Sequence, residues 1–318
     1  MKKAVIIFTL SLFAISCNNK PKNMAEIPDS RSRIIQSSEI NNKIKKGKDI
    51  VYKNVTVIGD IDFTQAGEVS IITGNLVKSY VNSGIVFYDC TFKGKIIAEK
   101  DGEKVKTITN FSKGISFINC TFQDTVNFTS SDFKDIVNFS NSIFQDFVSF
   151  KSTFFGSHGL IFSKTHFIKG AEFNMMNVSG SCNFSDAVFD DNVLFQLCKF
   201  NGYVRFASSV FNKNADFSRV KFNDDVFFNY AEFYRTLNFG TSVFKGRAEF
   251  IKSKFNMISE FKNCLFYSYT NFTDAEVKGI LTFENSIFYI SDAGKFNVKL
   301  SEGTDYILKG TQTLLKKP

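Results

Sequence analysis

Histidine is nearly absent from this chain: His158 and His166 are the only two among 318 residues. Neither has a cysteine or a carboxylate at the close spacing that a metal site or a general base needs. No Cys-x-x-Cys pair occurs, and the GxGxxG, GxxxxGK[ST], GxSxG and HExxH patterns are all missing. These absences argue against zinc sites, nucleotide-binding loops and the common hydrolase centres. We therefore expect no metal, no cofactor and no enzymatic activity.

A long apolar run is missing too. The apolar stretch Ala4–Phe13 has about half of the ~20 residues that span a bilayer, so we expect no permanent transmembrane helix. Lys2 and Lys3 precede this stretch, and Ala14-Ile15-Ser16 offers small residues where a signal peptidase cleaves. This order of features predicts a signal peptide over residues 1–16 and an exported protein.

Cys17 follows the predicted cleavage site directly. The segment resembles the lipobox of bacterial lipoproteins, although Ala14 stands where Leu is usual. The resemblance implies that Cys17 becomes the lipid-bearing N-terminus, with palmitate among its acyl chains. The protein would then lie in the bacterial cell envelope, at the outer membrane if the host is Gram-negative. Three acyl chains would anchor it stably, as one would not. The alternative is ordinary cleavage, with Cys17 incidental.

The charge of the chain does not point to nucleic acid. The net charge is +8, and without Lys2 and Lys3 there are 37 basic and 31 acidic residues, or +6. Both signs are mixed along the chain, and the one basic cluster, Lys43–Lys48, is typical of a solvated helix end. We therefore expect no nucleic-acid partner.

Phenylalanine is what the chain has in abundance, and it lies on a fixed grid. From Phe117 to Phe288 the spacing alternates between five and six residues, with one slip of a single residue near Gly156–Gly159. Of 32 grid positions 30 are Phe, and the exceptions are Val178 and Val277. Phe87 and Phe92 show the same spacing of five. A self-similar array of this kind indicates a repeat protein that grows along one axis.

The residues around each grid Phe predict short strands. A small or β-branched residue stands two positions before it, as in Val126 and Ser131, and a polar residue such as Asn127 lies between. Alternation places the small residue and the Phe on one inward face. Turn-forming Gly or Asp, such as Asp124 and Gly180, follows at the corners, where we expect bent or left-handed backbone. Short strands joined by regular corners wind into a parallel β-solenoid.

These residues resemble the pentapeptide-repeat family over about Phe87–Phe288. That family has a bulky central Phe or Leu and a small residue two positions earlier. The resemblance implies an all-β, right-handed parallel β-helix of quadrilateral type, with four repeat units to a coil. Two alternations of five and six then give about 22 residues per coil, a period within the range of known solenoids. The chain departs from the family through the extra residue in every second unit and through Phe almost everywhere in place of Leu.

The pattern divides the chain into segments. After the signal peptide (1–16) we expect a flexible tether (17–30), a short helical cap (31–48), the solenoid (49–290) and a C-terminal cap (291–318). The helix is expected to open at Ser37-Ser38-Glu39, with Ile40 and Ile44 on one face. Residues 65–81 read as irregular, and 98–110 as a charged loop inserted between coils.

Other chemistry-bearing side chains fall into the same pattern. Five cysteines occupy the small inward slot and are expected to be free buried thiols: Cys90, Cys120, Cys182, Cys198 and Cys264. The expected coil length puts Cys198 and Cys264 in one column but three coils apart, too far for a disulfide. The outward acids Glu172, Asp216 and Glu260 are expected on one side, each two coils from the next, as solvated surface.

Two outward columns are less polar than solvent exposure would favour. One contains Ile143, Val188 and Val210, and the other Val243, Leu265 and Ile287. Stacked apolar residues can form a contact patch for a partner or for a second copy. The alternative is that β-propensity or the C-terminal tail accounts for them.

Three functions are compatible with this pattern. The first is a non-enzymatic, lipid-anchored envelope scaffold that binds an unknown protein or itself. The second is a carbohydrate-binding or carbohydrate-active β-helix, in which outward aromatics such as Phe154, Phe227 and Tyr234 stack on sugars. The third follows from the family resemblance, because some pentapeptide-repeat proteins mimic DNA and protect a topoisomerase. That activity needs an acidic cytoplasmic rod, whereas this chain is basic and carries an export signal, so the first function is favoured.

Overall fold

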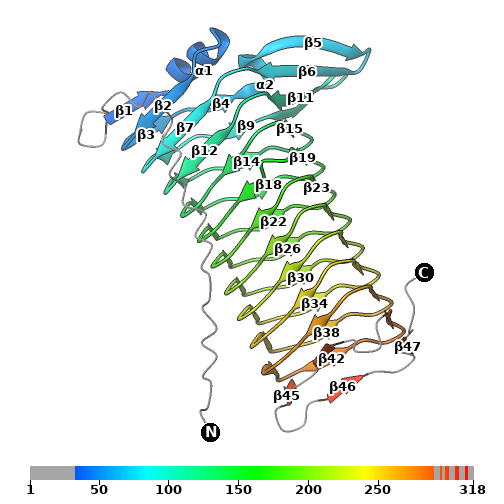
Figure 1. The fold of residues 1–318 in the computed structure, drawn as a ribbon. Coiled ribbons are helices and arrows are strands. Elements are labelled where there is room, and N and C mark those ends of the chain that lie inside the picture. Colours follow the sequence, from blue (N-terminus) through cyan, green and yellow to red (C-terminus); the bar gives the residue numbers. More distant parts are fainter. Residues whose placement is uncertain (1–32, 290–293, 296–297, 301–304, 308–311, 314–318) are drawn as a thin grey trace, which may run out of the picture.

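The computed structural model describes residues 33–289 and the strand residues 294–295, 298–300, 305–307 and 312–313. The predicted signal peptide, Cys17 and the tether lie outside the described residues. The described chain winds into a right-handed parallel β-solenoid with four sheets along its length, so the predicted fold class is confirmed (Figure 1). Val126 pairs with Val148, its equivalent one coil further on.

One coil shows how the chain passes through the four sheets. It runs through β12 (Ile115–Ile118) in sheet B, β13 (Thr121–Phe122) in sheet A, β14 (Val126–Asn127) in sheet C and β15 (Asp132–Phe133) in sheet D. The next strand, β16 (Val137–Asn138), pairs with β12 and starts the following coil. Because the sheets are visited in this order, sheet B lies opposite sheet C, and sheet A lies opposite sheet D.

The strands of each sheet stack in the order of the coils. Sheet A comprises β1 (Arg33–Gln36), β3 (Val55–Ile58), β8 (Thr91–Phe92), β13, β17 (Ile143–Phe144), β21 (His166–Phe167), β25 (Val188–Phe189), β29 (Val210–Phe211), β33 (Glu232–Phe233), β37 (Lys254–Phe255), β41 (Ala275–Val277) and β45 (Val298–Leu300). Sheet B comprises β2 (Ile50–Lys53), β7 (Ile85–Tyr88), β12, β16, β20 (Leu160–Ile161), β24 (Cys182–Asn183), β28 (Val204–Arg205), β32 (Val226–Phe227), β36 (Ala248–Glu249), β40 (Thr270–Asn271) and β44 (Gly294–Lys295).

Sheets C and D complete the square. Sheet C comprises β4 (Ile61–Asp62), β9 (Ile96–Ile97), β14, β18 (Val148–Ser149), β22 (Ala171–Glu172), β26 (Val193–Leu194), β30 (Ala215–Asp216), β34 (Leu237–Asn238), β38 (Ser259–Glu260), β42 (Ile280–Thr282) and β46 (Asp305–Ile307). Sheet D comprises β5 (Glu68–Thr73), β6 (Leu76–Val81), β10 (Glu99–Asp101), β11 (Lys106–Phe111), β15, β19 (Phe154–Phe155), β23 (Asn177–Val178), β27 (Lys199–Phe200), β31 (Lys221–Phe222), β35 (Val243–Phe244), β39 (Leu265–Phe266), β43 (Ile287–Phe288) and β47 (Gln312–Thr313).

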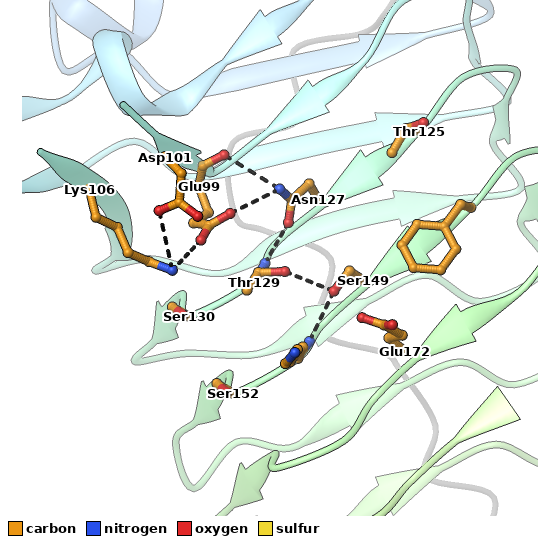
Figure 2. A pocket seen from close by; sticks show the side chains of 12 residues that line it. Glu99, Asp101, Lys106, Thr125, Asn127, Thr129, Ser130, Ser149, Ser152 and Glu172 are labelled. Carbon is orange, nitrogen blue, oxygen red and sulfur yellow. Dashed lines mark hydrogen bonds and ion pairs between the residues drawn. The ribbon is translucent and has the colours of Figure 1, made fainter. Parts of the chain in front are cut away.

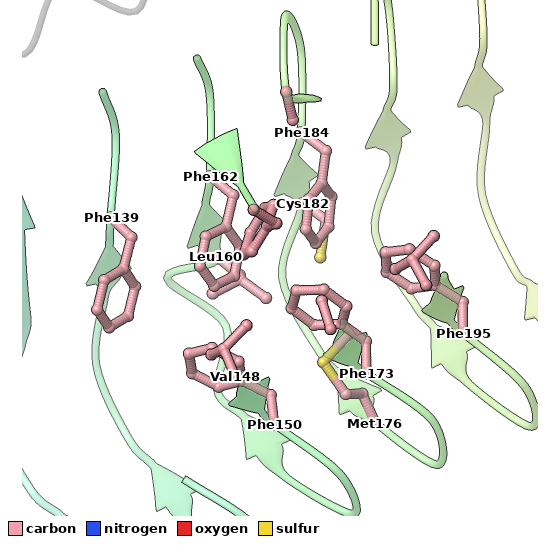
Figure 3. Close-up of a cluster of buried hydrophobic side chains, with 14 of the residues drawn as sticks. Phe139, Val148, Phe150, Leu160, Phe162, Phe173, Met176, Cys182, Phe184 and Phe195 are labelled. Atoms are coloured by element: carbon pink, nitrogen blue, oxygen red, sulfur yellow. The ribbon is translucent and has the colours of Figure 1, made fainter. Parts of the chain in front are cut away.

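The grid phenylalanines fill the interior as stacked ladders, which Val178 and Val277 interrupt. Phe195 stacks on Phe173 at 4.8 Å and on Phe217 at 4.7 Å between ring centroids, with the rings almost parallel. Phe184, from the opposite sheet, meets Phe195 edge-on at 5.4 Å and 89° (Figure 3). Stacked and edge-to-face contacts are the two favourable geometries of aromatic pairs. Phe195 is thus held by its own ladder and by the one facing it.

Val178 is a grid exception that its neighbour compensates. Met176, two positions earlier, occupies the slot that holds Thr153 and Cys198 in the adjacent coils, and both Met176 and Val178 are buried. The larger thioether therefore stands beside the smaller grid side chain, and Figure 3 shows Met176 among the rings. A larger side chain at the usually small position 176 and a smaller one at the usual Phe position 178 together keep this layer of the core filled.

The corners correct one prediction of the sequence. Among the described coils, left-handed backbone does not occur at the Asp124 type of corner, where six residues separate the grid positions. It occurs at every corner with spacing five from residue 119 onwards, including Met175 (φ 61°), Leu197 (φ 61°) and Tyr230 (φ 62°). A shorter connection needs the sharper left-handed turn, and the sixth residue relaxes the other corner. There an Asp accepts from the next backbone N–H, as Asp135 does from Ile136 at 2.7 Å.

Both ends of the rod depart from the simple coil. Helix α1 (Ser37–Lys45) covers the N-terminal end and buries Ile40 and Ile44, as predicted. Residues 65–81, expected to be irregular, end the short helix α2 (Phe63–Ala66) and form an antiparallel hairpin of β5 and β6. The insertion 98–110 likewise contains an antiparallel pair, β10 with β11. In the segment expected as a C-terminal cap, β44 to β47 add one further strand to each sheet.

Candidate functional site

The cysteines predicted to be free and buried are so. Cys90, Cys120, Cys182, Cys198 and Cys264 all lie inside the solenoid without a disulfide. Burial raises the pKa of Cys264 to about 12 and raises the pKa of Cys182 well above its usual value. Thiols that stay protonated are poor nucleophiles and poor metal ligands, which applies to Cys182 and Cys264. By burial, all five cysteines belong to the core.

Cys90 and Cys120 are nonetheless stacked neighbours, which the sequence analysis missed. The insertion 98–110 lengthens the coil between them, and Thr91 pairs directly with Thr121 on adjacent strands. Hydrogen bonding to the Cys120 thiol lowers the pKa of Cys90, and burial raises the pKa of Cys120. A fixed coil period could not reveal this pair.

Both histidines have carboxylate partners, contrary to the prediction from local spacing. His166 Nε2 lies 2.6 Å from Asp190 Oδ2, and His158 Nδ1 lies 3.5 Å from Asp135 Oδ1. Asn212 Nδ2 donates to the second Asp190 oxygen at 2.8 Å. These partners come from the adjacent coil, so a search for short spacings cannot find them. In the described part of the chain, no group of three or more His, Cys, Asp or Glu is placed to hold a metal ion.

The outward acids lie as predicted. Glu172, Asp216 and Glu260 share one outward column of sheet C, with Leu194 and Asn238 on the strands between them. The three carboxylates are therefore never on adjacent strands.

The two apolar columns face opposite sides of the rod. Ile143, Val188 and Val210 lie on sheet A, where His166 separates the first two. Val243, Leu265 and Ile287 lie on three consecutive strands of sheet D without interruption, each partly exposed. The structure does not bring the two columns together, and only the second is continuous.

The outward aromatics are also dispersed. Phe154 lies on sheet D beneath Lys134 Nζ, which is 5.4 Å from the ring centroid, and Phe227 lies on sheet B. Tyr234 follows β33 of sheet A, and its hydroxyl donates to Glu232 at 2.7 Å. Three aromatics on three faces cannot form one sugar-binding platform.

The hairpin of β10 and β11 overhangs sheet C and forms a hollow of about 410 Å³ (Figure 2). Glu99, Asp101 and Lys106 line it from the hairpin, and Asn127, Ser149 and Glu172 line it from successive strands. Figure 2 shows these side chains converging from the two elements. The inserted segment therefore supplies one wall of this recess.

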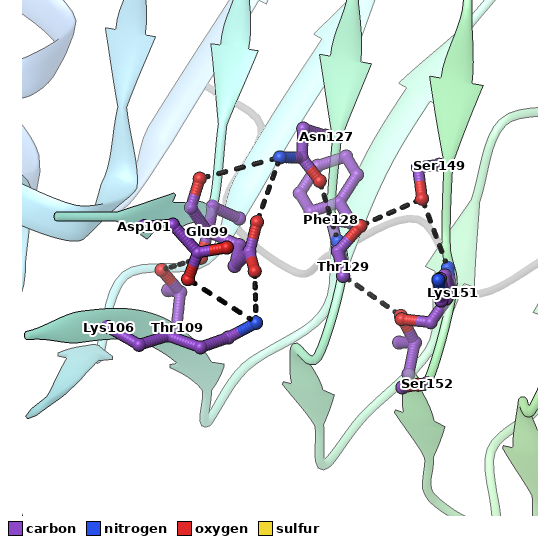
Figure 4. Close-up of polar contacts among 12 residues, drawn as sticks. Glu99, Asp101, Lys106, Thr109, Asn127, Phe128, Thr129, Ser149, Lys151 and Ser152 are labelled. Carbon is purple, nitrogen blue, oxygen red and sulfur yellow. Dashed lines mark hydrogen bonds and ion pairs between the residues drawn. The ribbon is translucent and has the colours of Figure 1, made fainter. Parts of the chain in front are cut away.

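Most polar groups in this hollow bind one another. Lys106 Nζ pairs with Glu99 and, at 3.7 Å, with Asp101, and hydrogen bonding to Glu99 raises the pKa of the ammonium group. Asn127 Nδ2 donates to Glu99 Oε2 at 3.3 Å, and the Thr129 and Ser149 hydroxyls are 2.8 Å apart (Figure 4). A ligand here would have to replace these contacts, which favours a structural role for the network.

A second hollow, of about 420 Å³, lies over sheet B beside the one-residue slip. His158 and Gly159 line it at the corner, Ile161 and Asn183 lie along the sheet, and Arg205 stands at its C-terminal side. Gly159 has φ +90°, a conformation that favours glycine, and so the extra residue is absorbed at the corner. In the sequence, the only sign of this hollow is the one-residue slip of the Phe spacing near Gly156–Gly159.

The comparisons with known proteins bear on the repeats. Residues 109–153 and 206–254 match the family described as pentapeptide repeats (9 copies). No curated protein matches the chain. Among solved structures, QnrB1, a plasmid-mediated fluoroquinolone resistance protein, matches with 13% identity. That match covers 80% of this chain and 91% of QnrB1, with a TM-score of 0.17.

No helix within the described residues has the length and apolar character required to cross a membrane. The described coils, including those of the two matched segments, have a buried Phe at the grid positions, a small residue two positions before most of them, and four strands to a coil. Residues 109–153 and 206–254 are therefore pentapeptide repeats, and the coils around them continue the same arrangement of four strands.

Proposed function

We propose that this pentapeptide-repeat protein is a non-enzymatic scaffold of the bacterial cell envelope, anchored by lipid at Cys17. Its rod presents the column Val243, Leu265 and Ile287 to a protein partner. The continuity of this column on three adjacent strands of sheet D carries the proposal. Three partly exposed apolar side chains in register offer a flat contact that water solvates poorly.

The face on which the column lies supports this role. Lys199 and Lys221 precede Val243 in the same outward column and are exposed. The face thus changes from basic to apolar along the rod. A partner with an apolar strip beside acidic residues would match both parts.

The envelope location is supported by the sequence features at residues 1–17. Its test is incorporation of labelled palmitate in the native host, followed by separation of membrane and soluble fractions. We expect the wild-type protein to carry label and to sediment with membranes. The Cys17→Ser variant should lose both properties. Unlabelled wild-type protein would refute the lipid anchor.

The contact column is tested separately by site-specific photocrosslinking. A photoreactive amino acid at Leu265 should give one discrete adduct in the envelope, whereas the same residue at Lys221 on that sheet should give much less of it. Leu265→Glu, combined with the photoreactive residue at Val243, should abolish the adduct. Equal adducts from positions 265 and 221 would refute a specific contact. An adduct of twice the mass of this chain would identify the partner as a second copy.

A further inference from the structure

We propose that the hollow over sheet B is a binding site for a carboxylate-bearing saccharide, with Arg205 as the residue that binds the carboxylate. Saccharide binding was an alternative function from the sequence, where it rested on aromatics that lie on three separate faces. The structure places it instead at the one-residue slip. The inference does not depend on the lipid anchor or on the apolar column of sheet D.

The Arg205 guanidinium is held in place but not neutralised. Its Cζ lies 4.8 Å from the centroid of the Tyr203 ring and 6.0 Å from that of Phe227. In the described part of the chain, Arg205 makes no ion pair with a carboxylate. Aromatic faces orient a guanidinium without using its N–H donors. Those donors remain available for the two oxygens of a ligand carboxylate.

Arg247, two coils further along sheet B, shows the contrast. Its Nε and Nη2 donate to Asp225 Oδ2 at 2.9 and 2.7 Å, and its Nη1 lies 3.6 Å from Glu249. It also lies over the Phe227 ring, at 5.6 Å. Arg247, which directly precedes β36, and Arg205 therefore share the aromatic neighbour Phe227, but of the two only Arg247 has carboxylate partners. The unpaired state of Arg205 is a local feature of this hollow.

The rest of the lining is rich in donors and has no acid. Among the described residues, no Asp or Glu lines this hollow, unlike the one beneath the hairpin. Asn138 Oδ1 and Asn183 Oδ1 each accept from a backbone N–H two residues on, at 2.9 Å. Their Nδ2 groups have no partner within the part of the chain that the structure describes and can donate to a ligand. A site with donors and a cation fits an acceptor-rich anion.

The shape and the apolar surface point to a sugar rather than a bare anion. Ile161 lies between Asn138 and Asn183 along the sheet, and the ring of Tyr203 lines the C-terminal side. A volume of about 420 Å³ suits one or two pyranose rings. The apolar face of a sugar ring can lie on Ile161 and Tyr203 while its hydroxyls accept from the two amides. A uronic or sialic acid unit combines these properties with a carboxylate.

The test is calorimetric titration of the full chain with trigalacturonate and with sialyllactose. We expect saturable binding of at least one of them, weakened by salt because a charge pair contributes. The methyl ester of the bound sugar, which keeps the ring but loses the charge, should bind at least tenfold more weakly. Acetate at the same concentration should not compete. Equal binding of the ester, or effective competition by acetate, would overturn the proposed ligand class.

Variants locate the site. Arg205→Gln should weaken binding at least tenfold, whereas Arg247→Gln, which removes the matched guanidinium, should change it less than twofold. Asn183→Asp keeps the acceptor for the backbone N–H but replaces the donor with a negative charge, and it should weaken binding similarly. Unchanged thermal unfolding of each variant shows that the fold is kept. Absence of saturable binding by both sugars, or full binding by Arg205→Gln, refutes the proposal.

Discussion

The exchange of sizes at Met176 and Val178 leads to a sharp stability prediction. Each side chain alone deviates from the repeat, and together they fill one layer of the core, where both are buried. Met176→Cys reproduces the residue in the next coil, Cys198, but leaves the space of the thioether chain empty beside Val178. By analogy with other truncations of buried Met, we expect a loss of about 2–4 kcal/mol in the free energy of unfolding.

Val178→Phe reproduces the grid but inserts a ring where Met176 already lies. Overpacking of this kind costs about 1–3 kcal/mol. The double variant recreates the arrangement of Cys198 with Phe200 and of Thr153 with Phe155, both of which the solenoid accommodates. In the described ladder of sheet D, no ring contact joins Phe155 to Phe200. The new ring would restore stacking between them.

The double variant should therefore lie within about 1 kcal/mol of the wild type, although the single losses would sum to roughly 3–7 kcal/mol if they were independent. Urea unfolding followed by circular dichroism, with the four proteins compared at equal slopes, measures this coupling. Additive losses in the double variant would refute the idea that one residue compensates for the other. The other grid exception is a control: Val277 has the small Ala275 two positions before it, so Val277→Phe meets no large neighbour in that slot and should cost less than Val178→Phe.

Three further predictions concern the corners and the thiols. Gly246→Ala should destabilise the rod by about 1–3 kcal/mol, because a Cβ there would lie 2.3 Å from the backbone carbonyl carbon of Asp224. As a control in the same urea assay, Gly74→Ala should be nearly neutral, because a Cβ at that position meets nothing within 4 Å. Leu197→Asn should raise the thermal midpoint and increase the free energy of unfolding by up to about 1 kcal/mol, because Asn tolerates the left-handed backbone found there (φ 61°). The same change at Leu194, in an extended strand, should bring no such gain. The free energy of unfolding should fall as the pH rises from about 9 towards 12, because the unfolded chain releases the Cys264 proton while the folded chain, in which the pKa of Cys264 is about 12, retains it. Cys264→Ala should reduce this dependence of stability on pH. An unchanged dependence would contradict the role given to the Cys264 thiol.

The grid determined most of the fold, because each Phe and the small residue before it report directly on burial. The position of left-handed corners did not follow from residue type, since Leu197 and Tyr230 have side chains that rarely adopt that backbone. Connection length decided instead, and it was visible as the alternation of five and six. The hairpins escaped prediction because residues 68–73 are exposed throughout, so they lack the buried alternation that marks a strand.

The site was harder to predict than the fold. Contacts such as His166 with Asp190, or Cys90 with Cys120, join residues of adjacent coils, and a fixed period locates them only where no insertion intervenes. The hollow over sheet B depends on a single extra residue and on an arginine without a partner. Neither property can be read from composition or from a motif, because whether an arginine has a carboxylate partner depends on which residues of other coils lie near it in the fold.

Alternation between tight and wide corners gives the rod a modular length. Each coil starts and ends at the same kind of corner, so removal of one complete block, such as residues 207–228, would join Phe206 to Asn229 in the place where Ala207 stood. The inward ladders and the outward columns would keep their register across the junction, and the rod would be one coil shorter. Lengthening by a duplicated block follows the same rule, and the distance between the helical end and the apolar column on sheet D could be set in steps of a single strand spacing, about 4.8 Å.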